Sequence, residues 1–147
     1  QNLKVLDILP ALFETVVVPP AVAHELASPI AEFPPIAIAE TKGFRVQAPT
    51  DAVRTAKLRV FLDAGESEAI SLALELNALL LIDERAGRAA ARGLCIVITG
   101  TAGILLESRR RGWLGPLRPI LANLRHEHHF HMSDAFVEEI LRRAGEL

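Results

Sequence analysis

Two short apolar runs, 78-ALLLI-82 and 94-LCIVI-98, constrain the fold of this chain most strongly. Neither run alternates with polar residues, and a segment with helical patterning follows each of them. Strands that are apolar on both sides are typical of parallel sheets, because helical crossovers cover both faces of such a sheet. The sequence therefore predicts an α/β fold in which helices cover a central parallel sheet on both sides.

The rest of the chain continues this alternation of strands and helices. A β-branched run predicts a strand at 15–18, and a weaker apolar segment predicts another at 44–47. Apolar residues at helical spacing predict helices over 3–13, 20–27, 51–61, 65–77, 84–92, 101–111, 116–126 and 133–144, with a connection over 28–42. The length of 147 residues, half of them apolar, fits one compact domain over 1–147.

Composition excludes several classes of protein. The single cysteine, Cys95, excludes an internal disulfide and agrees with a reducing compartment. No apolar stretch reaches the roughly 18 residues that cross a bilayer, and no basic segment precedes an apolar one as in a signal peptide. The net charge of −2 does not favour non-specific nucleic-acid binding over the whole surface. We therefore expect a cytoplasmic protein without a membrane anchor.

Asp83 is the acid that the predicted fold singles out. It follows the run 78–82 directly, and Thr99 occupies the same place after the run 94–98. In open α/β sheets, functional sites collect beyond the carboxyl ends of the strands. Asp83 is thus a candidate site residue, and the N-cap of the next helix is its structural alternative.

Three glutamates are further candidates. Asp63 and Glu66 have the spacing of a capping box, which is a sufficient role for both. Glu68 has apolar neighbours near a helix start, where a carboxylate is costly unless a metal ion or an arginine pairs with it. Glu25 fits a solvated helix residue. Carboxylates without a cysteine or ordered histidine pattern suit Mg²⁺ or Mn²⁺ rather than zinc.

Three further segments have a structural and a functional interpretation each. The turn 99-TGTAG-103 lacks the GxGxxG and P-loop patterns, so it indicates either a phosphate site or a helix capped by Thr101. The run Arg109-Arg110-Arg111 fits a helix C-terminus, where positive charge is favourable. The histidines of 126-HEHHFH-131 fit a solvated turn, or metal ligands on a shared face.

Several blocks of the chain together resemble a known family. They are VVVPPAVAHEL, DAGESEAISLALEL, ALLLIDERAGRAAA, VITGTAGILLESRRRG and FHMSDAFVEEILRRAGE. From about Leu3 to Glu146 the chain is similar to stand-alone PIN-domain proteins, and most of all to a subfamily of small, toxin-like prokaryotic members. The resemblance implies an α/β/α sandwich, a cluster of acids at the strand ends that binds Mg²⁺ or Mn²⁺, and cleavage of RNA.

The resemblance also implies roles for individual residues. Family acids fall on Glu25, on Glu68 with Glu66 as the alternative, and on Asp83. The residues that would position RNA are Arg85, Arg88, Thr99, Thr101, Arg109 and Arg110. The first acid and first strand of the family have no counterpart here, and the sequence begins with Gln1 rather than Met. We therefore expect the sequence to start inside a longer reading frame.

Three functions remain open at this point. The first is a metal-dependent ribonuclease, acting as the toxin of a type II toxin–antitoxin pair with an antitoxin protein as its partner. The second is a PIN-like protein that binds nucleic acid or serves as a scaffold without cleaving. The third is a nucleotide-binding or phosphohydrolase domain that uses the TGTAG turn. The apolar content is compatible with a homodimer.

Overall fold

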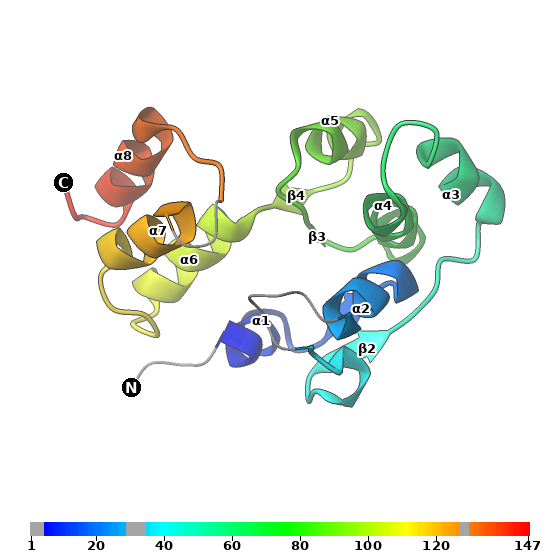
Figure 1. Cartoon of the computed structure of the whole chain (residues 1–147), viewed down its shortest axis with the longest axis horizontal. Helices are drawn as coiled ribbons and strands as arrows, with labels where there is room; N and C mark the ends of the chain where they lie inside the picture. Colours follow the sequence, from blue (N-terminus) through cyan, green and yellow to red (C-terminus); the bar gives the residue numbers. More distant parts are fainter. Residues whose placement is uncertain (1–4, 29–34, 127–129) are drawn as a thin grey trace. The chain divides into compact units, whose positions relative to one another are not determined.

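The computed structural model describes residues 5–28, 35–126 and 130–147 and divides the chain into two compact units (Figure 1). We call Leu9–Gly100 the strand unit, and Gln1–Ile8 with Thr101–Leu147 the helical unit. Helix α1, Val5–Phe13, has residues in both units. It matches the predicted helix over 3–13, apart from residues 3 and 4, which lie outside the described ranges. The prediction of one domain over 1–147 stays a prediction.

The strands of the strand unit form two parallel pairs. β1, Val16–Val18, pairs with β2, Phe44–Val46, and β3, Leu80–Leu81, pairs with β4, Ile98–Thr99. Helical crossovers connect the partners of each pair, as parallel pairing requires. The parallel strands and intervening helices confirm the α/β fold. Within the described ranges the strands form two two-stranded sheets rather than one continuous sheet.

The strand predicted over 94–98 is displaced toward its carboxyl end. Leu94 is the C-cap of α5, and Cys95 has a φ of 59°, which is incompatible with an extended strand. Only Ile98 of the predicted run belongs to β4. The predicted burial of this run is wrong for most of its residues: Ile96 is buried, whereas Leu94, Cys95 and Val97 are exposed. Leu94 and Cys95 turn the chain out of α5.

The helices of the strand unit follow the predicted positions closely. They are α2, Pro20–Ala27, the short 3-10 helix η1, Ile38–Glu40, α3, Ala52–Leu58, α4, Ala64–Leu76, and α5, Arg85–Gly93. Asp51 caps α3, and Asp63 with Glu66 forms the predicted capping box at the start of α4. Asn77 ends α4 in the left-handed conformation that asparagine tolerates.

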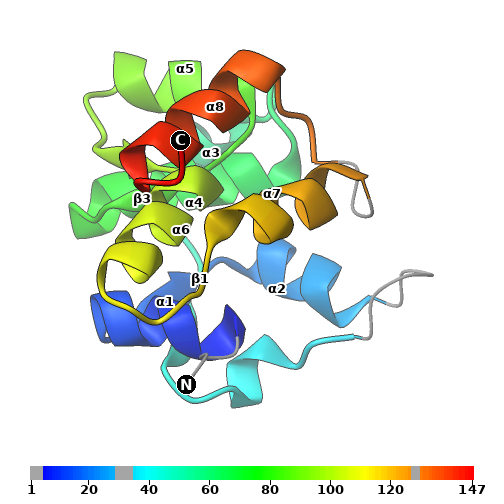
Figure 2. The same ribbon diagram turned by 90° about the vertical axis from the view of Figure 1, so that its left-hand side faces the viewer.

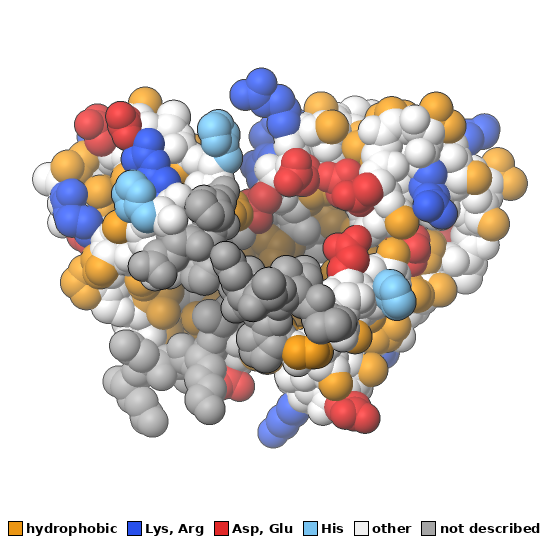
Figure 3. Space-filling view, in the orientation of Figure 1, with side chains coloured by type: hydrophobic (Ala, Val, Ile, Leu, Met, Phe, Trp, Pro, Cys, Tyr) orange, Lys and Arg blue, Asp and Glu red, His pale blue; other side chains and the backbone are white. Residues whose placement is uncertain are grey.

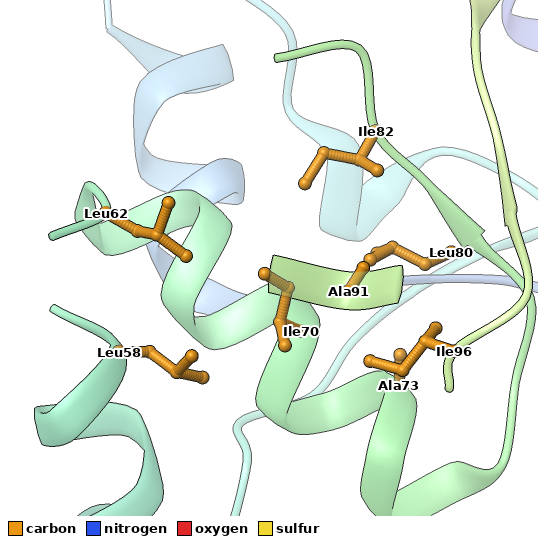
Figure 4. Packing of buried hydrophobic residues seen from close by; sticks show 8 residues of the cluster. All are labelled: Leu58, Leu62, Ile70, Ala73, Leu80, Ile82, Ala91 and Ile96. Atoms are coloured by element: carbon orange, nitrogen blue, oxygen red, sulfur yellow. The ribbon is translucent and has the colours of Figure 1, made fainter. Parts of the chain in front are cut away.

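The apolar core of the strand unit lies between α4 and the β3–β4 pair (Figure 4). Ile70 and Ala73 of α4 face Leu80 and Ile82 of the β3 segment and Ala91 of α5 in this cluster. Leu58, Leu62 and Ile96 complete the buried set. This packing holds α4 and α5 against the β3 segment, which ends at the candidate acid Asp83.

The helical unit contains α6, Thr101–Arg110, α7, Leu117–His126, and α8, Asp134–Arg143 (Figure 2). Ser133 caps α8 as predicted. Leu117, Leu121, Met132, Ile140 and Leu141 form its core. His126 ends α7, while His128 and His129 lie outside the described ranges. None of the helices that the structure describes is long and apolar enough to span a membrane.

Candidate active site

Asp83 lies directly beyond the β3–β4 pair. The N–H of Ile82 donates to the carbonyl oxygen of Thr99 at 2.9 Å, so the pairing reaches the residue before Asp83. The N-cap of α5 is Glu84, and no side-chain cap hydrogen bond is present there. Asp83 is therefore not the helix cap that the structural alternative proposed. Its position beyond the carboxyl end of a strand is the one expected for a site residue.

The carboxylate of Asp83 lies close to where a side chain at Gly100 would be. A Cβ atom added at Gly100 would lie 2.7 Å from Asp83 Oδ1 and 2.9 Å from Arg88 Nη1. Arg88 Nη1 also donates to the carbonyl oxygen of Ile82 at 2.8 Å. The half-buried guanidinium of Arg88 thus lies at the end of β3, on the same side of Gly100 as Asp83.

Glu66 is the acid on which several other charges act. Burial is the largest cause of its raised pKa, and the charges of Asp63, Glu84 and Glu25 raise it further. The hydrogen bond from the N–H of Asp63 in the capping box opposes this rise. Like charges close together disfavour ionisation of each carboxyl group, and a bound cation would relieve that repulsion.

Glu25 lies near the first turn of α4 although α2 carries it. A Cβ atom added at Gly65 would lie 3.4 Å from Glu25 Oε1 and 3.6 Å from Asp63 Oδ1. The side chain is exposed, as predicted for a solvated helix residue. It nevertheless lies within reach of the acids at the start of α4.

Glu68 has a different environment from Glu66. Its Oε1 accepts a hydrogen bond from the N–H of Ala21 at 3.1 Å. Ala21 is in the first turn of α2, where backbone N–H groups have no partner within the helix. One partner of Glu68 is thus the N-terminus of a helix, a partner that the sequence did not indicate. Glu66, the alternative, is the glutamate whose pKa the neighbouring acids raise.

Three glycines lie next to the candidate acids. The Cβ position at Gly65 is 3.2 Å from Val22 Cγ2 and 3.4 Å from Glu25 Oε1, that at Gly87 is 2.5 Å from Ile82 Cδ1 and 3.3 Å from Glu66 Oε1, and at Gly100 the nearest atom is Asp83 Oδ1. Gly65 and Gly87 are in the first turns of α4 and α5, and Gly100 immediately precedes α6. A helix N-terminus carries partial positive charge, which favours a carboxylate nearby.

The donor chemistry of this group fits a hard divalent cation. Glu25, Glu66 and Asp83 offer carboxylate oxygens, which Mg²⁺ and Mn²⁺ prefer. Figure 3 shows acidic side chains gathered over the region of α2, α4 and β3. Among the residues that the structure describes, however, no group of three or more histidine, cysteine, aspartate or glutamate side chains is close enough to hold a metal ion.

The predicted RNA-positioning residues fall into both units. Arg85 is exposed at the first position of α5, and Thr99 is half-buried in β4. Thr101 is the first residue of α6 rather than its N-cap, so the predicted cap is one residue out of place.

Arg109 and Arg110 are in the last turn of α6, in the helical unit. Arg110 is hydrogen-bonded to Glu107, and Arg111 pairs with the same carboxylate; these contacts hold the pKa of Glu107 at about 2. Arg109 Nε lies 3.9 Å from Glu146 Oε2. These contacts agree with the helix C-terminus interpretation of the arginine run.

Comparison with known families identifies the class of protein to which this fold and this group of acids belong. The model of the family DUF3368, described as a PIN domain, matches residues 1–146. The chain therefore belongs to the PIN-domain family, whose members are generally nucleases. No curated protein and no solved structure gave a significant match.

Proposed function

We propose that this protein is a metal-dependent ribonuclease of the PIN type, in which Glu25, Glu66 and Asp83 hold Mg²⁺ or Mn²⁺. The observation that carries this proposal is that Glu25 of α2 lies at the first turn of α4, where it acts on Glu66 together with Asp63 and Glu84, while Asp83 directly precedes Glu84 at the end of β3. The charges that raise the pKa of Glu66 support it, since an acidic cluster of this kind is stabilised by a cation.

Each residue has a distinct part in this proposal. Glu25, Glu66 and Asp83 bind the cation, which, when bound, supplies Lewis-acid chemistry at the scissile phosphate. Glu68 holds the first turn of α2 through Ala21, and α2 carries Glu25. The exposed Arg85 contacts the RNA backbone, which contributes affinity rather than sequence selectivity.

Cleavage of a labelled single-stranded RNA, with and without Mn²⁺, tests the proposal. We expect cleavage only with the metal, and we expect Asp83→Asn and Glu66→Gln each to lower the rate at least about 100-fold. Glu68→Gln is the matched control, because glutamine keeps a hydrogen-bond acceptor for Ala21 and the site acids are unchanged. If Glu68→Gln lowered the cleavage rate by this amount and Glu66→Gln did not, Glu68 rather than Glu66 would be the metal-binding glutamate.

A second candidate is a PIN-like protein that binds nucleic acid without cleaving it. The observation in its favour is that the described part of the chain has no ready group of three metal-binding side chains. RNA binding of equal affinity with Mn²⁺ and with EDTA, without cleavage in either, would support this candidate. Binding that is tightened by Mn²⁺ and accompanied by cleavage would exclude it.

The cellular role that we propose for this ribonuclease is that of the toxin of a type II toxin–antitoxin pair in the cytoplasm. It is supported only by membership of the PIN-domain family. Growth arrest on expression of the chain, its loss in Asp83→Asn, and its relief by a protein encoded beside it would test the role. Size-exclusion chromatography of the purified chain would show whether it forms a homodimer. A nucleotide that raises the melting temperature would instead favour the phosphohydrolase alternative.

A further inference from the structure

The Arg88 side chain turns back along its own segment, toward the end of β3. Its Nη1 atom donates to the carbonyl oxygen of Ile82 at 2.8 Å, six residues earlier in the chain. The residue is half-buried, in contrast to Arg85 on the same helix, which is exposed. The hydrogen bond to the backbone thus fixes the guanidinium of Arg88 at the end of β3.

Gly100 shows that Arg88 and Asp83 share one small space. The Cβ position at Gly100 is 2.7 Å from Asp83 Oδ1, 2.9 Å from Arg88 Nη1 and 3.6 Å from the carbonyl oxygen of Ile82. Three polar atoms therefore surround a point that only glycine leaves empty. A guanidinium has five N–H donors in a planar fork, so it can donate to a carbonyl and still present other N–H groups to a nearby carboxylate.

From this geometry we infer that Arg88 is a positioning residue that holds the Asp83 carboxylate and the end of β3 in place, and does not contact RNA. The inference rests on the proposed function for the role of Asp83. It assigns the two arginines of α5 to different tasks: Arg88 orders the site, and Arg85 contacts the RNA backbone. A lysine at position 88 would keep the charge but not the planar fork.

Kinetics of the full chain with Mn²⁺ and labelled RNA separate these two tasks. We expect Arg88→Ala to lower kcat about 10-fold or more and to change KM less than about two-fold. Arg88→Lys should recover little of this loss, whereas added methylguanidinium should recover part of it in Arg88→Ala. Arg85→Ala, the matched control, should raise KM and leave kcat unchanged. A raised KM with an unchanged kcat in Arg88→Ala would overturn the inference.

A double-mutant cycle on the metal-free protein tests the same inference without activity. The thermal midpoint is measured for Arg88→Ala, for Asp83→Asn and for the double variant. We expect the two single shifts not to sum to that of the double variant, whereas the cycle of Arg85→Ala with Asp83→Asn should be additive. If Arg88→Ala does not fold, the cycle is run with Arg88→Lys. Additivity in both cycles would overturn the inference; failure of the wild type to cleave RNA would overturn only the proposed function.

Discussion

Glu66 and Glu68 are two residues apart on α4 and face different neighbours. Glu66 Oε1 lies above Gly87 of α5, whereas Glu68 Oε1 accepts a hydrogen bond from Ala21 of α2. The sequence predicted the capping box of Glu66 because its partner, Asp63, is three residues away. It could not predict the partner of Glu68, because Ala21 is 47 positions distant and only the fold brings the two together.

The raised pKa of Glu66 has a consequence for stability. Burial, followed by the neighbouring acids, raises the pKa of Glu66 above 4.5, the value expected in the unfolded chain. A group of this kind favours the folded state below pH 4.5, and this contribution is lost as the pH rises through the folded-state pKa. Metal-free wild type and Glu66→Gln should therefore converge in thermal midpoint at acidic pH.

At neutral pH we expect Glu66→Gln to have the higher midpoint, because glutamine keeps the capping-box acceptor without the charge. Thermal unfolding followed by circular dichroism between about pH 4 and pH 8 checks this. Added Mn²⁺ should raise the midpoint of the wild type and not that of the variant. A wild type that is more stable than Glu66→Gln at neutral pH without metal would contradict the prediction.

At the scale of elements, α4 stabilises two other helices through its glutamates. Glu68 accepts from the N–H of Ala21 at the start of α2, and Glu75 Oε1 accepts from the N–H groups of Thr50 and Asp51 at the start of α3. Both carboxylates satisfy N–H groups that the helices leave without internal partners. The first of these helices carries Glu25, and the second does not contribute to the candidate site.

Glu68→Ala and Glu75→Ala therefore form a matched pair. Each should lower the free energy of unfolding, because N–H groups at the start of a helix lose their acceptor. Only Glu68→Ala should also lower the rate of RNA cleavage, because α2 then holds Glu25 less firmly. Urea unfolding and the cleavage assay measure the two effects. An equal loss of cleavage in Glu75→Ala would show that general destabilisation explains it.

The glycines at the helix starts allow a second prediction at this scale. Gly100→Ala would place a methyl group 2.7 Å from Asp83 Oδ1, so both Asp83 and Arg88 must move. We expect cleavage to fall at least about 10-fold. Gly93 in α5 has no atom within 4 Å of its Cβ position, so Gly93→Ala is the control and should raise stability by about 0.5–1 kcal/mol. Cleavage that is unchanged in Gly100→Ala would show that the position of Asp83 is not critical.

Helices were easier to predict than strands for a physical reason. The helices over 20–27, 65–77 and 84–92 carry local signals, namely Pro20, the capping box and the periodic apolar residues. β3 and β4 have two residues each, and their pairing depends on partners elsewhere in the chain. The two apolar runs are also only partly buried: Leu80, Ile82 and Ile96 are buried, whereas Leu79, Leu81 and Val97 are exposed. An apolar run does not show which of its residues form the ladder.

At the scale of the whole molecule, the question is whether the two units unfold together. α1 is one helix whose first residues belong to the helical unit and whose last residues belong to the strand unit. The second junction, between Gly100 and Thr101, joins the units without an intervening linker. The helical unit is also in the range below about 60 residues, where a core alone gives only marginal stability.

For these reasons we expect a single cooperative unfolding transition, as the sequence-based prediction of one domain requires. Trp113 is the only tryptophan of the chain and belongs to the helical unit, so its fluorescence reports on that unit alone. Far-ultraviolet circular dichroism reports on the helices of both units. Coincident midpoints in urea would support one domain, since coincidence of independent probes is the test of two-state unfolding. Loss of the fluorescence signal at a lower urea concentration would show that the helical unit unfolds independently, and the strand unit would then have to be tested alone for metal binding.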